Sequence, residues 1–113
     1  MSKEAYVYFM SNLRNSTLYV GVTTDLLRRV AEHKAHVNKG FTDIYNCEKL
    51  VYFEELESIG VAIEREKVLK KWKRKWKNDI INAVNPKWAD LSESIGLTAE
   101  FIDSVKEHYK QEG

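Results

Sequence analysis

A tyrosine, a glycine, an arginine and a histidine follow one another along the chain at Tyr19, Gly21, Arg29 and His33. A guanidinium group binds phosphate oxygens through paired hydrogen bonds, and phenol and imidazole groups can orient or deprotonate a water molecule. A glycine beside these groups lets the backbone of a ligand come close. These residue types suit chemistry on a phosphate ester, provided that the local structure brings them together.

The pattern around these residues predicts a strand followed by a helix. Residues 18–22 alternate, with Tyr19 and Gly21 on one face of a strand. Residues 25–37 have the period of an amphipathic helix. We expect one side of that helix to carry Leu26, Arg29, Val30 and His33. The other side would carry Arg28 and Glu32, which point away from the site.

A second tyrosine-bearing strand lies just upstream, over Ala5–Met10, and a linker rich in turn-forming residues joins the two strands as a hairpin. The alternation predicts that one face packs in the core, with Val7, Phe9, Leu18, Val20 and Val22. The opposite, non-core face would carry Tyr6, Tyr8 and Tyr19. Tyrosine is common in strands because of its high β-propensity, but these three accompany Gly21 and Arg29, which favours a functional role.

The segments Tyr6-Val7-Tyr8 and Tyr19-Val20-Gly21 resemble the two half-motifs of the GIY-YIG nuclease family. The similarity extends from about Ala5 to Leu91 and is greatest to small stand-alone proteins related to the N-terminal nuclease domain of the bacterial excinuclease. Two residues depart from that pattern. Tyr6 stands in place of the leading glycine, and Val22 stands where the excinuclease domain has a lysine.

The resemblance implies a divalent-metal-dependent DNA endonuclease, using Mg²⁺ or Mn²⁺, with a role in DNA repair or recombination. The catalytic residues that it implies are Tyr8, Tyr19, Arg29, His33 and Asn85. Tyr19 would act as general base or orient the attacking water, and Arg29 would bind a phosphate oxygen. His33 would serve as base or proton relay. Asn85 precedes Pro86 at a helix end, where a simple C-cap is the alternative role.

Glu66 is the candidate metal ligand, since it interrupts an otherwise apolar helix face. A buried carboxylate needs a compensating cation. Lys70, one turn further on, can supply it as an ion pair, or a metal ion can bind there with water and phosphate oxygens. The residues alone favour the ion pair, whereas the resemblance favours the metal. Glu64 competes for this role but faces away from the apolar side.

The formal net charge of the chain is only +1, but it is unevenly distributed: residues 1–89 carry +5 and residues 90–113 carry −4. Eight basic residues lie between Arg65 and Lys77, and we call this segment the basic stripe. It predicts weak, salt-dependent DNA binding, although a solvated helix face would look the same. We expect the tryptophans within it, Trp72 and Trp76, to pack in the core.

The composition is that of an ordinary soluble globular protein, with 43% hydrophobic and 31% charged residues, and the pattern of strands and helices predicts the α+β class. We expect three antiparallel strands near residues 5–10, 17–22 and 49–55, and helices starting near residues 25, 59, 78 and 98. The nuclease-like domain would span residues 1–91, and residues 92–113 would form an acidic helical extension. One cysteine, Cys47, excludes an internal disulfide, and the absence of an apolar N-terminal region predicts a cytoplasmic location.

Two other functions remain open at this point. A non-catalytic nucleic-acid-binding module could keep the nuclease shape, but it would not need Glu66 on an apolar face. A protein-interaction adaptor could use the C-terminal helix for docking and would ignore divalent ions. For an endonuclease this small, we also expect that a protein partner can supply specificity.

Overall fold

The computed structural model describes residues 4–112, with side chains described from residue 4 to residue 110. One antiparallel sheet has the strand order β2-β1-β3. The strands are β1 Ala5–Ser11, β2 Leu18–Thr23 and β3 Lys49–Leu56. The helices are α1 Leu26–Ala35, α2 Phe41–Ile44, α3 Ile59–Lys71, α4 Arg74–Val84 and α5 Ala99–Glu112, and a 3-10 helix covers Glu93–Ile95. The expected α+β class and antiparallel sheet are confirmed.

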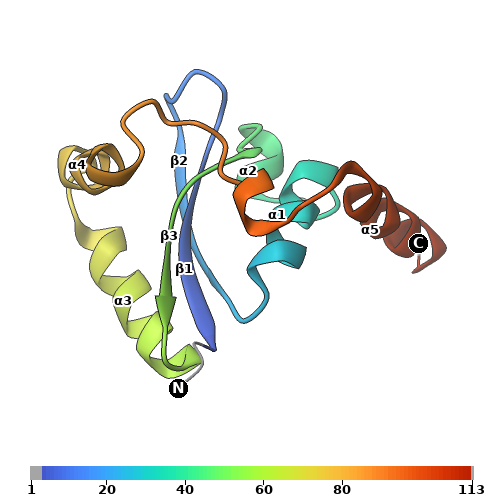
Figure 1. The fold of residues 1–113 in the computed structure, drawn as a ribbon, viewed down its shortest axis with the longest axis horizontal. Helices are drawn as coiled ribbons and strands as arrows, with labels where there is room; N and C mark the ends of the chain where they lie inside the picture. Colours follow the sequence, from blue (N-terminus) through green and yellow to red (C-terminus); the bar gives the residue numbers. More distant parts are fainter. Residues whose placement is uncertain (1–3, 113) are drawn as a thin grey trace.

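Helices cover both faces of the sheet. In Figure 1, α3 and α4 lie on one side, while α1, α2 and α5 lie on the other. β1 is the central strand, and its residues supply buried side chains to both layers. Within the described residues, no helix is long and apolar enough to cross a membrane.

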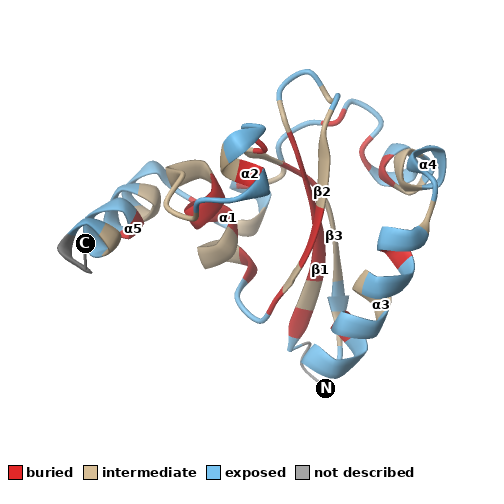
Figure 2. Cartoon of the chain, turned by 180° about the vertical axis from the view of Figure 1, so that it is seen from behind, coloured by how far each residue is buried: buried red, intermediate tan, exposed pale blue. Residues whose placement is uncertain are grey.

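The face of the sheet that carries the tyrosines is a second core, which corrects the expectation of a non-core face. The alternation of β1 and β2 is as expected, because Val7, Phe9 and Val20 pack on the α3 side. Tyr8, however, is only 1% exposed, and it packs with Met10 under α1. Figure 2 shows this burial running along the middle of the sheet. The reason is that α1 buries its apolar side on this face, while α5 packs on α1.

Two helix boundaries differ from the expectation. α3 ends at Lys71 and α4 begins at Arg74, not near residue 78, because Trp72 and Lys73 adopt extended backbone conformations. Neither residue is a glycine or proline, so the sequence contains no breaker there. Trp72 packs against the core, but Trp76 is 49% exposed, so its expected core position is wrong. α2 lies in a segment where no helix was expected, because its four residues are too few to show a period.

β3 contains a bulge that links the sheet to α4. Phe9 pairs with Tyr52 and Met10 pairs with Leu50, so Val51 has no partner on β1. The Nδ2 of Asn85 donates to the Val51 carbonyl at 3.0 Å and to the Ala89 carbonyl at 2.9 Å, and its Oδ1 accepts from the Ala89 N–H at 3.1 Å. The side-chain amide of Asn85 thus fastens the end of α4 and the following segment to the bulge.

We expect Asn85→Ala to lower the free energy of unfolding by about 2 to 4 kcal/mol, since it leaves buried carbonyl groups without donors. Urea denaturation would measure this change. The exposed neighbour Lys87 provides the control, because Lys87→Ala removes no buried hydrogen bond. Equal stability of the two variants would show that the amide does not hold the bulge.

Candidate active site

Two tyrosines from neighbouring strands meet above a glycine. Tyr8 of β1 lies opposite Gly21 of β2, and the rings of Tyr8 and Tyr19 are 6.1 Å apart on the same face of the sheet. A Cβ atom at Gly21 would lie 2.6 Å from the Tyr8 hydroxyl and 2.7 Å from Cε2 of Tyr19. Only glycine leaves room for both rings at this position, which explains why it follows the second tyrosine in the motif.

His33 of α1 is hydrogen-bonded on both ring nitrogens. Its Nε2 lies 2.8 Å from the Tyr8 hydroxyl, and its Nδ1 lies 2.9 Å from Oγ1 of Thr42 on α2. The His33 ring also lies 5.6 Å from the ring of Tyr19. Burial, followed by the charge of Arg29, lowers the pKa of His33 to about 4. His33 is therefore neutral at pH 7 and has one acceptor nitrogen.

Tyr8 is the most strongly perturbed phenol at this site. Burial raises the pKa of Tyr8 far above its usual value, and the phenol of Tyr19 and the carboxylate of Glu66 raise it further, whereas Arg29 lowers it. Tyr8 therefore keeps its proton at neutral pH. The charges of Arg29 and Glu66, on helices that lie on opposite faces of the sheet, thus both act on this phenol.

Arg29 is held by Glu32 on the same helix. The Arg29 Nε atom lies 3.6 Å from Glu32 Oε1, and the Arg28 Nε atom lies 3.3 Å from Glu32 Oε2. We expected Glu32 to point away from the site, but its side chain is only 9% exposed and reaches Arg29. The reason is α5, whose Tyr109 hydroxyl donates to Glu32 Oε2 at 2.9 Å and covers this side of α1.

Glu66 pairs with Lys70 at 3.4 Å, so the structure contains the ion pair that the sequence allowed. The Glu66 side chain is 16% exposed, but that of Lys70 is 53% exposed, so the pair lies at the surface. Glu64 is 75% exposed and faces away, as expected. Among the described residues there is no group of three or more histidine, cysteine or acidic side chains that could hold a metal ion.

A lone carboxylate fits some metal ions and not others. Mg²⁺ keeps several of its waters and is bound by one or two carboxylates together with substrate phosphates, and Mn²⁺ also prefers oxygen ligands. Zn²⁺ needs three or four protein ligands. Glu66 therefore fits a Mg²⁺ or Mn²⁺ ion that the substrate helps to bind.

A shallow pocket of about 270 Å³ opens beside Tyr19, with Phe41, Lys70 and Lys77 among its lining residues. Burial, and after it the charges of Arg74 and Lys70, lowers the pKa of Lys77. An anion that binds here would reduce the electrostatic repulsion between these neighbouring cations. Half of the basic stripe is occupied elsewhere: Arg65 binds Glu54, Lys67 pairs with Glu64, Arg74 binds backbone carbonyls and Lys75 pairs with Asp79.

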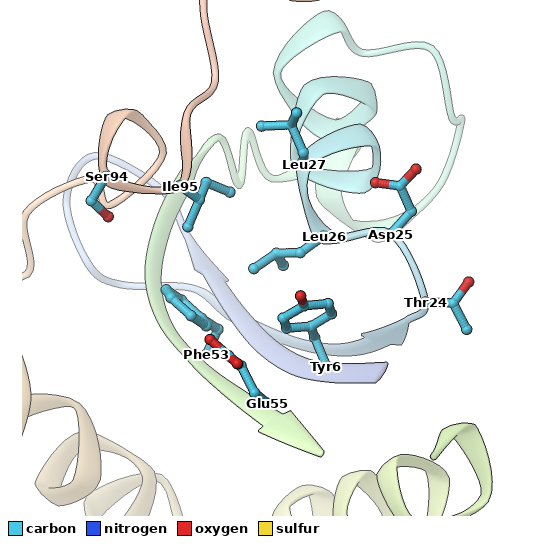
Figure 3. A pocket seen from close by; sticks show the side chains of 9 residues that line it. All are labelled: Tyr6, Thr24, Asp25, Leu26, Leu27, Phe53, Glu55, Ser94 and Ile95. Carbon is cyan, nitrogen blue, oxygen red and sulfur yellow. The ribbon is translucent and has the colours of Figure 1, made fainter. Parts of the chain in front are cut away.

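Tyr6, which replaces the motif's leading glycine, lies away from this cluster. It lines a separate pocket of about 400 Å³ with Asp25, Phe53 and Ile95, between the sheet and the start of α1 (Figure 3). Its ring fills space between Leu26 and Phe53 in that view. The departure from the motif therefore changes a wall beside the site and leaves Tyr8 and Tyr19 in place.

The structure thus brings Tyr8, Tyr19 and His33 together, with Arg29 one turn before His33 on α1, and the charge of Glu66 acts on Tyr8 from α3. The side-chain amide of Asn85 does not take part in this cluster. All its hydrogen bonds to described residues go to backbone groups of the bulge and of the segment after α4. Sequence reasoning missed Thr42, because its helix is too short to show a pattern.

The depressed pKa of His33 predicts acid sensitivity. The unfolded chain takes up this proton near pH 6.5, whereas the folded protein resists it down to about pH 4. The contribution of His33 to the free energy of unfolding is therefore complete above pH 6.5. As the pH falls to about 4, this contribution is lost, and it amounts to about 3 kcal/mol. Urea denaturation at neutral and acid pH should show a smaller fall for His33→Gln, while His108→Gln, in the exposed part of α5, should retain the full fall.

Comparison with known proteins identifies the family. Residues 4–79 match the GIY-YIG catalytic domain. A UPF0213 protein of Natronomonas pharaonis is 36% identical over 81 residues, which cover 72% of this chain and 94% of that protein. A UPF0213 protein of Listeria monocytogenes is 33% identical over 73 residues, covering 65% of this chain and 81% of its own.

A UPF0213 protein of Streptococcus pyogenes is 36% identical over 72 residues, covering 64% of this chain and 77% of its own. No solved structure matches the chain significantly. The matched region includes both half-motifs, with Tyr8 and Tyr19, and the helices that carry Arg29, His33 and Glu66. The chain therefore belongs to the GIY-YIG family of nuclease domains.

Proposed function

We propose that this protein is a DNA endonuclease that hydrolyses phosphodiester bonds and depends on Mg²⁺ or Mn²⁺. The observation that carries the proposal is the cluster of Tyr8, Tyr19, His33 and Arg29 around Gly21, with the negative charge of Glu66 acting on the Tyr8 phenol from α3. A role in DNA repair or recombination is supported only by the resemblance to the excinuclease domain.

Arg29 is the phosphate-binding residue of this proposal. Its Nε atom faces Glu32, and its Nη groups make no hydrogen bond to another residue in the described part of the chain. A guanidinium group held in this way keeps two donors in parallel for the non-bridging oxygens of a phosphate. Hydrolysis adds charge to those oxygens, so this contact strengthens in the transition state.

The two tyrosines have different roles in the reaction. Tyr8 is buried and keeps its proton, and a transfer from a phenol of raised pKa to an imidazole of pKa about 4 is unfavourable. We therefore assign His33 and Thr42 to holding Tyr8 in place rather than to relaying a proton. Tyr19 is half-buried and borders the open pocket, so it is the phenol that meets the attacking water, as its base or its orienting partner.

Glu66 would hold the metal ion, in exchange for its contact with Lys70. Bound there, the ion would supply positive charge to the phosphoryl oxygens and to the departing oxygen. Lys70 is then free to contact the neighbouring phosphate from the wall of the pocket beside Tyr19. We expect Asn85 to act by holding β3 and residues 86–89 in position, since its amide is fully used there.

The DNA backbone would follow the side of the pocket that carries Lys70 and Lys77, with Phe41 on the opposite wall. Because Arg65, Lys67, Arg74 and Lys75 of the basic stripe already have partners within the protein, we expect few phosphate contacts. Binding should therefore be weak and depend on salt.

Lys77→Gln should reduce the slope of log affinity against log salt by about one unit, the amount expected for one lost phosphate contact. Fluorescence anisotropy with a short labelled duplex, in EDTA and over a series of salt concentrations, would measure the slope. Lys75→Gln is the matched control, since Lys75 is exposed on the same helix and paired with Asp79. A slope that changes equally in both variants would remove Lys77 from the DNA path.

The function itself is tested by incubating the protein with supercoiled plasmid and branched DNA in Mg²⁺, in Mn²⁺ and in EDTA. We expect cleavage in either metal, none in EDTA, and loss of cleavage in Glu66→Gln. Because Lys70 is half exposed, that change should cost less than about 1 kcal/mol in stability.

Thermal melts provide an independent arm of the same test. Mg²⁺ or Mn²⁺ should raise the melting temperature of the parent protein, since a ligand that binds only the folded state stabilises it, and Glu66→Gln should lose this rise. A protein that binds DNA, ignores both metals and cuts no substrate would be a binding module instead.

A further inference from the structure

The C-terminal helix α5 lies outside the region matched to the GIY-YIG domain, yet it reaches the site. The match ends at residue 79, whereas α5 covers Ala99–Glu112. α5 lies beside α1 (Figure 1), with Val105 almost fully buried in the cluster under α1. Near the end of α5, the Tyr109 hydroxyl donates to the carboxylate of Glu32 at 2.9 Å.

Glu32 has partners on both carboxylate oxygens. Oε2 accepts from Tyr109 and lies 3.3 Å from the Arg28 Nε atom. Oε1 lies 3.6 Å from the Arg29 Nε atom and accepts from Asn38 Nδ2 at 3.4 Å. A carboxylate shared in this way, with its side chain only 9% exposed, has little freedom to rotate. The angle at which it meets Arg29 is therefore set partly by α5.

The atom of Arg29 that lies nearest to the Glu32 carboxylate is Nε, at 3.6 Å, and not either of the two Nη groups. The guanidinium group is near enough to the site to lower the pKa of both Tyr8 and His33. Glu32 is thus placed to aim the two Nη donors of Arg29 towards the ligand side. The hydrogen bond to Glu32 raises the pKa of Tyr109, which keeps this phenol protonated as a donor.

We propose that Tyr109 and Glu32 are positioning residues for Arg29, so that the C-terminal helix is a working part of the nuclease site. The inference rests on the proposed function in one respect, namely that Arg29 binds the scissile phosphate. The contacts themselves, from Tyr109 to Glu32 to Arg29, do not depend on it.

The chain contains a matched control for this arrangement. On the far side of the sheet, the Tyr52 hydroxyl donates to Glu54 at 2.7 Å, and Glu54 binds Arg65 at 2.9 Å. Tyr52→Phe and Tyr109→Phe therefore each remove one phenol hydroxyl from a carboxylate that binds an arginine. Only Tyr109→Phe changes a carboxylate next to Arg29.

The first measurement needs neither metal nor DNA. The Nε–Hε resonance of Arg29 reports on its ion pair with Glu32, since a carboxylate 3.6 Å from Nε shifts this resonance and slows the exchange of its proton with water. In ¹⁵N NMR spectra, we expect Tyr109→Phe to shift this resonance and speed its exchange, and Glu32→Gln to do so more strongly. Tyr52→Phe should leave it unchanged.

The second measurement is steady-state cleavage of DNA. Tyr109→Phe should lower kcat about tenfold with little change in KM, as expected for a contact that matters in the transition state. In an Arg29→Lys background, the same change should have no further effect, because the residue through which Tyr109 acts is already altered. Tyr52→Phe should retain the parent kcat.

The outcomes separate the two proposals. If the parent protein cuts no DNA, the endonuclease proposal fails, and the Arg29 resonance still decides whether Tyr109 acts on Arg29. An Arg29 resonance that is the same in Tyr109→Phe and Tyr52→Phe would overturn the positioning proposal. So would a loss of kcat that is equally large with and without Arg29, since that is the result of a merely structural role.

Discussion

The need to satisfy one buried hydroxyl group organises this structure. Tyr8 lies in the central strand and is 1% exposed, so its hydroxyl must find a partner within the protein. His33 of α1 supplies that partner, and Thr42 of α2 satisfies the other nitrogen of the same ring. A strand and two helices are thereby fixed to one another by polar contacts inside an apolar layer.

This constraint also explains the electrostatics of the site. The burial that fixes Tyr8 raises its pKa, and the burial of His33 lowers the pKa of the imidazole, so both groups are neutral at pH 7. The charged groups, Arg29 and Glu66, lie on helices at the two faces of the sheet. A neutral, rigid centre flanked by one cation and one anion suits a substrate that brings its own negative charge and binds a divalent ion.

Much of this arrangement could be predicted from the sequence, because alternation in a strand and period in a helix decide which residues share a face. These rules place Tyr8 and Tyr19 on the same face of the sheet. They also give the side of α1 that carries His33. The burial of the tyrosine face did not follow, since it depends on how α1 packs across the sheet, and no local pattern shows that. Glu32 was misplaced because α5 covers its side of α1, which no local pattern shows either.

Other differences arose where the sequence has no local signal. The break between α3 and α4 occurs at Trp72, a residue with no helix-breaking character, whose side chain packs against the core instead. Thr42 lies in a helix of one turn, which periodicity cannot detect. The hydrogen bonds of Asn85 depend on a bulge in a strand far from it in the chain.

The bulge in β3 limits how this domain can vary in length. Val51 has no partner on β1, so a chain lacking that one residue could still form a regular ladder with every other pair kept. The sheet does not need Val51, but its carbonyl is the acceptor for Asn85, and its side chain is fully buried against the α3 side. A one-residue deletion that leaves the sheet intact would thus remove the acceptor that fastens the end of α4 to β3. Such deletions in β3 should be tolerated only together with a change at position 85.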